Sequence, residues 1–287
     1  MNAAVELDHR DVEASGAPRA IVLRTHGTTH GAITRLVSPS DIGELIKPFV
    51  FLDLFAADPA NAPRFGWHPH SGIATCTVIF QGEVAYEETT GVKGTLGAGE
   101  VEWMRAGGGV WHTGSPSGTQ PTKGFQLWVA LPPDLENGSS ESRYLSADEV
   151  DRDGPARVVL GSHGTVRSPI LAPAGINYLD VRLSAGEQWT YQPPAGHSVA
   201  WIAVHDGRVY APELVSTGEL VVFEDSHRAI TFNAVESAGF VLGSAVKHPH
   251  ELVLGHYSVH TQASTLRAGE AEIQRIGREL MSAGILR

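Results

Sequence analysis

The sequence predicts an all-β protein built from two copies of one β-barrel plan, with a short helix at the C-terminus. Three observations carry this prediction: short apolar runs separated by turn residues, a polar stretch near the middle, and a similar order of motifs on both sides of that stretch. The 32 Gly and 17 Pro suit a chain in which tight turns join many short strands.

The predicted strands are apolar or β-branched runs that end at Gly, Pro, Asp or Asn. Their regular spacing indicates an antiparallel sandwich or barrel. The clearest runs are AIVLRT, FVFLDLF, ATCTVIF, EVAYEETT, EVEWM and GFQLWVAL in the first half, and NYLDVRLS, VAWIAVH, LVVFED, AITFNA, GFVLGSAV and ELVLGHYSVH in the second.

A weak internal repeat indicates the domain organisation. VIFQGEVAYEE precedes LGAGEVEWM in the first half, and IAVHDGRVYAP precedes VSTGELVVFED in the second. Each half thus places a hairpin around a Gly before a Gly-Glu turn and another strand. We expect a polar segment at 1–20, a first barrel at 21–133, a Pro-, Gly- and Ser-rich linker at 134–156, a second barrel at 157–262 and a helix at 263–287.

The predicted helix has one apolar stripe, formed by Ile273, Ile276, Leu280 and Met281. Such a stripe favours packing against the side of a sheet, and binding of a partner protein is the less favoured interpretation.

Composition excludes some classes of function. The chain carries 21 basic and 32 acidic residues, a net charge of −11, so we expect neither nucleic-acid nor membrane binding. The first 20 residues lack the apolar core of a secretory signal, and no run reaches the roughly 20 apolar residues of a membrane helix. We therefore expect a cytoplasmic protein. Its one cysteine, Cys76, excludes an intrachain disulfide and a cysteine-based zinc site.

The tripeptide HPH occurs at 68–70 and again at 248–250. Residues i and i+2 of a strand point to one face, so His68 and His70 can present two imidazoles to one metal. Pro69 between them predicts that this strand lies at a sheet edge or just after a loop. His112 follows the Gly-rich turn AGGG, and three imidazoles suit Fe(II), Ni(II), Cu(II) or Zn(II). Spacing alone leaves a second interpretation open, a turn histidine beside a packed one.

The second HPH lacks a histidine that would complete a barrel site. When the two halves are aligned, the ligand positions of the second barrel fall near Pro193, Ala195 and Thr231. We expect this barrel to have no metal site, and His248 and His250 to cap a turn.

Residues 68–112 resemble the first motif pair of the pirin family, whose pattern runs H-P-H-R-G-F-E-T, G-E-V, and then G-D-V-Q-W-M-T-A-G-x-G-I-x-H-x-E. This chain has HPHSGIAT, GEV and GEVEWMRAGGGVWH. PFVFLDLF is similar to the family's P-F-L-x-F-D-x-F, and GFQLWVALP to its G-x-Q-L-W-V-x-L-P. The resemblance is strong over about residues 30–133 and fainter beyond.

The resemblance implies a bicupin, two cupin-type β-barrels face to face, with a mononuclear metal site in the N-terminal barrel. His68, His70 and His112 correspond to the family's three histidine ligands. Fe(II) is the expected metal, with Ni, Cu, Mn and Zn as alternatives. The implied activity is that of a quercetin 2,3-dioxygenase-like oxidoreductase acting on a flavonol or another small aromatic or enolic substrate. Two alternatives stay open: a non-enzymatic metal- or redox-responsive regulator that binds a protein partner, and a metal-free remnant.

Two acidic positions of the family pattern are absent. The Glu of H-x-E, the family's fourth ligand, is Gly114 here, and the Glu that follows the second motif histidine is Ala74. Three neutral imidazoles leave a metal its full 2+ charge, which makes it a stronger Lewis acid that favours an anionic substrate, while metal is held less tightly. The candidates for a replacement carboxylate are Glu87, Glu88 and Glu102.

Other residues of the motif region have two interpretations each. Trp67, Trp103, Trp111 and Trp128 can line a pocket for a flat ligand or fill the barrel core. Cys76 is evenly spaced from His70, which places it on the same side if the strand is regular, most simply as an inert buried thiol.

Overall fold

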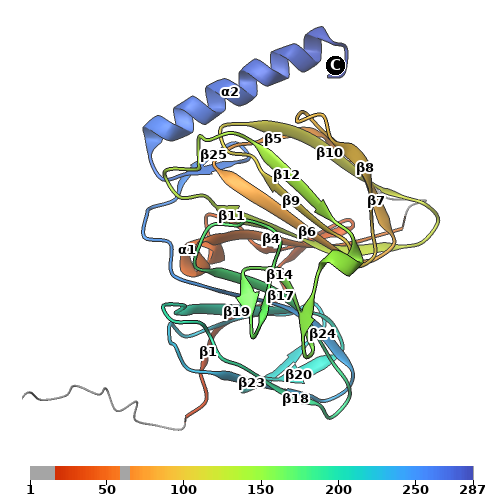
Figure 1. The fold of residues 1–287 in the computed structure, drawn as a ribbon, viewed down its shortest axis with the longest axis vertical. Helices are drawn as coiled ribbons and strands as arrows, with labels where there is room; N and C mark the ends of the chain where they lie inside the picture. Colours follow the sequence, from red (N-terminus) through yellow and green to blue (C-terminus); the bar gives the residue numbers. More distant parts are fainter. Residues whose placement is uncertain (1–16, 59–64, 287) are drawn as a thin grey trace, which may run out of the picture.

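Two β-barrels face each other in the computed structural model, which describes residues 17–58 and 65–286 (Figure 1). Within those ranges, each barrel combines a seven-stranded and a four-stranded antiparallel sheet. The prediction of an all-β chain with two barrels and a C-terminal helix is confirmed. Of the polar segment expected at 1–20, residues 1–16 lie outside the described residues.

The strands of the two barrels follow the same plan. In sheet order, the first barrel has β12 (Glu141–Leu145), β9 (Val101–Arg105), β6 (Ile73–Gln81), β11 (Thr122–Ala130), β4 (Phe49–Ala57), β3 (Ile33–Val37) and β2 (Thr28–His30), then β5 (Phe65–His70), β10 (Val110–Ser117), β7 (Glu83–Glu88) and β8 (Lys93–Gly97). The second has β1 (Ile21–Thr25), β22 (Leu220–Phe223), β19 (Val199–Asp206), β24 (Ala238–Ala245), β17 (Ile176–Leu183), β14 (Ala156–Leu160) and β13 (Arg152–Asp153), then β18 (Gln188–Tyr191), β23 (Ile230–Ala234), β20 (Arg208–Tyr210) and β21 (Leu214–Ser216). The remaining described elements are two hairpins, two α-helices and one 3-10 helix. They are β15–β16 (Ser162–His163, Val166–Arg167), β25–β26 (Val253–Gly255, Ser258–His260), α1 (Ile42–Ile46), α2 (Ala263–Ser282) and η1 (Ala147–Glu149).

The two large sheets pack against each other through a shared apolar core. Trp103 and Leu127 of the first sheet are buried in one cluster with Tyr178 and Trp201 of the second. The indole of Trp201 meets the ring of Phe49 edge to face, with centroids 5.4 Å apart. Because side chains alternate along a strand, one face of each large sheet packs in this shared core and the other faces the interior of its own barrel.

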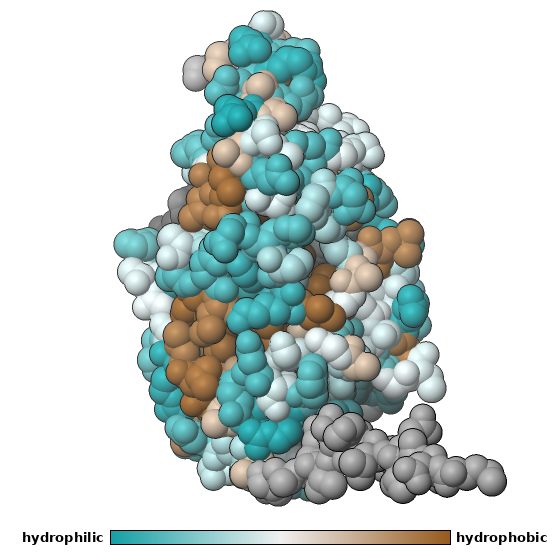
Figure 2. All heavy atoms as spheres, turned by 90° about the vertical axis from the view of Figure 1, so that its left-hand side faces the viewer, coloured by the Kyte–Doolittle hydropathy of each residue, from teal (hydrophilic) through white to brown (hydrophobic). Residues whose placement is uncertain are grey.

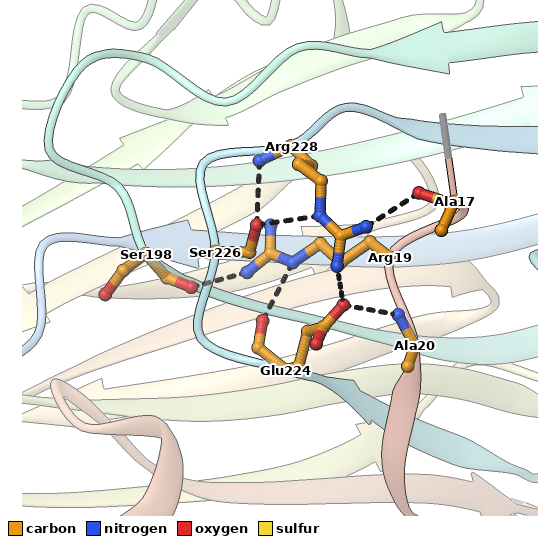
Figure 3. Close-up of polar contacts among 7 residues, drawn as sticks. All are labelled: Ala17, Arg19, Ala20, Ser198, Glu224, Ser226 and Arg228. Carbon is orange, nitrogen blue, oxygen red and sulfur yellow. Dashed lines mark hydrogen bonds and ion pairs between the residues drawn. The ribbon is translucent and has the colours of Figure 1, made fainter. Parts of the chain in front are cut away.

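The start of the described chain lies on the second barrel. The expected first barrel begins at residue 21, but β1 pairs with β22 at the edge of the second large sheet. The reason is visible in Figure 3: the buried side chain of Arg19 donates from Nε to the carbonyl of Glu224 (2.9 Å) and from its guanidinium to the carbonyl of Ser198. These bonds fasten the strand to the loops of the second barrel.

Part of the expected linker belongs to the two large sheets. β12 pairs with β9 of the first barrel, and β13 pairs with β14 of the second. β12 is an edge strand with one exposed face, so its polar composition is that of an edge rather than of a free linker.

The helix α2 lies against the first barrel, across β10 and β26 (Figure 1). Ile273 and Leu280 are buried, and the indole N–H of Trp111 donates to the carbonyl of Ile273 at 2.7 Å. Met281, expected on the same stripe, is 59% exposed, because at 100° per residue it lies about 80° around the helix from Ile273. Figure 2 shows a mainly hydrophilic surface at the top, where α2 lies, with apolar patches lower on that face.

Neither helix among the described residues combines the length and apolar character that a membrane-spanning segment requires.

Candidate metal centre

His68 and His70 lie on β5, an edge strand of the smaller sheet of the first barrel, as Pro69 predicts. β5 pairs with β10, and this register puts His112 directly opposite His68. Directly opposed residues of an antiparallel pair share a face, as do residues i and i+2 of one strand. The structure therefore brings all three predicted histidines together.

The three rings are close enough to share one ion. Their candidate ligand nitrogens all lie within 4.8 Å of one another, and Nε2 of His70 is 3.1 Å from Nε2 of His112. The ring centroid of His68 is 5.1 Å from that of His70 and 4.3 Å from that of His112. Two imidazoles bound about 2.1 Å from one metal, at angles between square and tetrahedral, have nitrogens about 3.0–3.4 Å apart. The donor set fits a transition metal.

Backbone carbonyls fix the tautomers of two rings. Nδ1 of His68 is 2.9 Å from the carbonyl oxygen of Gly66, and Nδ1 of His70 is 3.1 Å from that of Tyr257. A carbonyl only accepts hydrogen bonds, so each Nδ1 carries the proton and each Nε2 keeps its lone pair. Metal-binding imidazoles are commonly oriented by such a bond from the other ring nitrogen.

Burial keeps the three imidazoles neutral. Desolvation, with repulsion from His68, lowers the pKa of His70 to about 3, and desolvation also holds the pKa of His112 well below its ordinary value. The pKa of His68 is lowered by burial as well, although its bond to Gly66 opposes the shift. The neutral imidazole is the form that binds a metal.

His68 and His112 border a cavity of about 720 Å³ with largely apolar walls, and His70 lies fully buried behind them. Trp128 stacks on Phe51, with ring centroids 4.0 Å apart and planes 7° apart, and the ring of His70 is 4.8 Å from that of Trp128. The exposed residues Ser40 and Tyr257 also line the cavity, so it opens to solvent. Its size and lining suit a small flat organic molecule.

The four tryptophans of the motif region divide between the two interpretations. Trp67 and Trp128 line the cavity. Trp103 belongs to the core between the barrels, and Trp111 packs beneath α2.

Cys76 does not share a face with His70. Gly72, at φ 73°, separates β5 from β6, so the even spacing between the two residues spans a break rather than one regular strand. Cys76 and Ala74 both point into the shared core, where burial raises the pKa of the thiol well above its usual value. Cys76 is thus the inert buried thiol that we expected, and Ala74 is remote from the cavity wall.

The three candidate glutamates have different environments. Glu102 lines the cavity and accepts a hydrogen bond from the hydroxyl of Thr77. Glu88 is buried too, but it accepts a 2.8 Å bond from the hydroxyl of Tyr144 and is not part of the cavity lining. Glu87 is exposed. None of the three belongs to the cluster of ligand atoms.

Sequence reasoning missed the contribution of the hairpin β25–β26. Tyr257, at φ 59°, accepts the bond from His70 Nδ1, and its ring centroid is 5.7 Å from that of His68. His256 lies in the turn of this hairpin, and His260 lies on β26. No local signal marks a contact between residues 187 positions apart.

The second HPH forms no comparable centre. The rings of His248 and His250 are 5.3 Å apart in a segment after β24, and within residues 17–58 and 65–286 no third His, Cys, Asp or Glu completes a group with them. Apolar side chains such as Phe232 and Phe240 fill the interior of the second barrel. Thr231, at an aligned ligand position, is exposed on β23.

Comparison with known proteins gives consistent matches. The family profile described as Pirin matches residues 31–129. The chain is 32% identical over 209 residues to a Pseudomonas aeruginosa protein provisionally named quercetin 2,3-dioxygenase, covering 67% of this chain and 72% of that protein. The fold of this chain is similar to that of a quercetin 2,3-dioxygenase from Acinetobacter baumannii, with a TM-score of 0.80 and 22% identity over 90% of this chain and 98% of that one. It is also similar to that of the bacterial pirin YhhW from Escherichia coli in complex with nickel(II), with a TM-score of 0.62 and 20% identity over 80% of this chain and 96% of that one.

Proposed function

The chain belongs to the pirin family, and from that premise we propose that it is a metal-dependent dioxygenase of small enolic or phenolic substrates of the quercetin type. The names of its relatives support the substrate class by similarity. The observation that carries the proposal is that three neutral imidazoles converge at the wall of an aromatic cavity.

In this proposal His68, His70 and His112 hold one divalent transition metal. Fe(II) is the first choice, with Ni, Cu, Mn and Zn as alternatives, and the nickel(II) complex of the E. coli relative supports a metal of this class. When bound, the metal supplies a Lewis acid for an anionic substrate oxygen and a route for electrons between substrate and dioxygen.

The protein's own groups bind and orient the substrate. Trp128 and Phe51 offer a stacked pair against which a flat ring can lie. His70 is fully buried behind the cavity wall, held by Tyr257, so its Nε2 keeps one direction. The apolar walls exclude water around the substrate, which strengthens charge interactions inside the cavity.

Gly114 changes the charge of the proposed site. Without a carboxylate ligand, three imidazoles leave the metal at 2+, so an enolate or phenolate is the substrate form best matched to it. A 2+ metal at this site would therefore favour weakly acidic hydroxy compounds over those that cannot ionise.

The test is oxygen uptake with quercetin after loading with Fe(II), Ni(II), Cu(II) or Mn(II). His70→Ala removes a proposed ligand and should abolish uptake and lower bound metal to below about a tenth of an equivalent. His250→Ala changes the same tripeptide outside the centre and should leave both unchanged. Uptake by wild type no greater than that of His70→Ala with every metal would remove the proposal.

A second candidate is a metal-responsive protein that binds a protein partner, and Gly114 favours it because a catalytic site is expected to keep a fourth ligand. Recovery of one stoichiometric partner, lost on chelation, combined with absent oxygen uptake, would support this candidate over the enzyme.

A further inference from the structure

We propose that Glu102 is the group that takes the hydroxyl proton of the substrate, so that a weakly acidic enol or phenol binds as its anion while its proton stays in the cavity. This inference rests on the proposed function, because it assigns a role at the same site. In the described part of the chain, the candidate ligand cluster consists of three imidazoles and contains no carboxylate that could accept this proton.

The register of β9 aims Glu102 into the first barrel. Its neighbours Val101 and Trp103 belong to the core between the barrels, so the side chain between them points the other way. Glu102 lies opposite Thr77 of β6, is 6% exposed and lines the same cavity as His112. A ligand that reaches the histidines therefore shares one cavity with this carboxyl group.

Two hydroxyl groups hold the carboxyl group in place. Thr75 donates to Oε1 at 3.1 Å, and Thr77 donates to Oε2. Each oxygen of a carboxylate has two lone pairs, so each keeps one that can accept a further proton or hydrogen bond. No Lys, Arg or His within residues 17–58 and 65–286 forms an ion pair with Glu102, and the carboxylate is not neutralised by a cation.

The other acidic side chains near the cavity are already committed. Asp53 forms an ion pair with Arg35. Glu88 accepts from Ser142 and Tyr144 and is not part of the cavity lining. Glu102 combines access to the cavity with free acceptor capacity.

The family pattern adds an independent observation. It has Gln at the position of Glu102 and Glu at the positions of Ala74 and Gly114, so this chain lacks two carboxyl groups of the pattern and has a different one in the cavity wall. Glu102 is therefore a cavity carboxyl group that this chain has where the pattern has an amide.

The ionisation of Glu102 supports the role. Burial raises its pKa to about 7, with a further contribution from Glu88, while the threonine hydroxyls oppose the shift. The other titratable groups that interact with it are Tyr86 from β7, Tyr144 from β12 and Cys76 from β6. A proton acceptor with a pKa near 7 is well matched to an enol or phenol at neutral pH.

The proposed step is a single proton transfer. The substrate O–H bond breaks, an O–H bond forms on Oε1 or Oε2 of Glu102, and the negative charge passes from the carboxylate to the substrate oxygen. No electron leaves either partner, and no co-reactant is required. Substrate binding therefore releases no proton to the solution.

The test uses the full chain loaded with Zn(II), which cannot change its oxidation state, and 3-hydroxyflavone, which has a single ionisable hydroxyl. At pH 8 we expect wild type to bind this probe with the absorption spectrum of its anion and to release less than about a tenth of a proton per molecule bound. Glu102→Gln, which keeps the shape of the side chain, should bind it as the neutral form or release about one proton. Glu87→Gln, which changes an exposed glutamate of β7 outside the cavity lining, should match wild type.

Two outcomes separate this inference from the proposed function. If Glu102→Gln gives the same spectrum and proton count as wild type while melting at the same temperature, the role of Glu102 is wrong, whatever the oxygen uptake. If the probe behaves as expected but no metal supports oxygen uptake, the dioxygenase proposal fails and the proton-accepting role stands. With an active metal, Glu102→Gln should slow oxygen uptake roughly 10²- to 10⁴-fold.

Discussion

At the residue scale, a carboxyl group buried as deeply as that of Glu102 makes the stability of the fold depend on pH. Burial raises its pKa from an ordinary 4.5 to about 7, so the folded chain keeps a proton that the unfolded chain has lost. This contribution to stability is fully present below pH 4.5 and is lost as the pH rises to about 7. In the metal-free protein, wild type should therefore lose about 3 kcal/mol of unfolding free energy relative to Glu102→Gln as the pH rises from 4.5 to 7.5, because glutamine does not titrate.

Urea denaturation at each pH measures this difference. Glu87→Gln should follow the wild-type curve, because the side chain of Glu87 is exposed. If the stabilities of wild type and Glu102→Gln run parallel from pH 4.5 to 7.5, Glu102 is not a buried proton-binding group.

The sequence predicts some residues of the candidate site but not the distant residues that orient them. The spacing of His68 and His70 on an edge strand predicts two donors on one face. His112, after the Gly-rich turn, is a candidate third donor from the sequence alone, and the resemblance to a family favours it over a packed histidine. The carbonyl of Tyr257, which fixes the tautomer of His70, lies far along the chain and leaves no trace in local sequence. Local spacing encodes which side chains share a strand face, but it does not encode which distant backbone they meet.

At the scale of elements, the contact between β26 and the turn that joins β5 to β6 is close enough to test with one methyl group. Gly72 has φ 73°, and a Cβ atom there would lie 2.0 Å from the carbonyl oxygen of Val259. Gly91 has φ 89° but no atom within 4 Å of its Cβ position. Alanine at either position incurs backbone strain of about 1 kcal/mol, and only at Gly72 must a neighbouring strand also move.

We therefore expect Gly91→Ala to lower the unfolding free energy by about 1 kcal/mol and Gly72→Ala to lower it by about 3 kcal/mol or more. Chemical denaturation of the two variants side by side measures the difference. Equal losses at both positions would mean that β26 moves easily and is not firmly packed against the turn between β5 and β6.

Element types were predicted better than element roles. The apolar stripe predicts α2, but the stripe does not reveal that Trp111 anchors the helix by donating to Ile273. The polar composition of 134–156 predicts a linker, yet β12 and β13 extend the two sheets there. A short edge strand needs few apolar residues, so composition does not distinguish it from a loop.

At the scale of the whole molecule, the two barrels use one plan for opposite purposes. The interior of the second barrel is filled by Phe232, Phe240 and other apolar side chains, whereas the first keeps an open cavity with histidines at its wall. Both give the outer face of their large sheet to the shared core. The second barrel therefore acts as a packed support for the first. The repeat in the sequence predicts that both are barrels, but it does not predict that only the first keeps a cavity.

The hairpin β25–β26 is also bonded to the strand that carries the candidate metal ligands His68 and His70. His70 is bonded to Tyr257, and the amide of Val259 donates to the carbonyl of Ser71 at 3.3 Å. When a metal fixes His70, opening of β25–β26 must release a bond that orients a ligand. Metal at 100 times its dissociation constant stabilises the bound state by about 2.7 kcal/mol, which slows hydrogen exchange through opening of the hairpin about 100-fold.

Amide hydrogen exchange at 253–260 should thus slow by up to this factor on metal loading. His250→Ala should keep the effect and His112→Ala should lose it, while unchanged exchange of this hairpin in the loaded wild type would mean that the C-terminal segment and the histidine cluster behave independently.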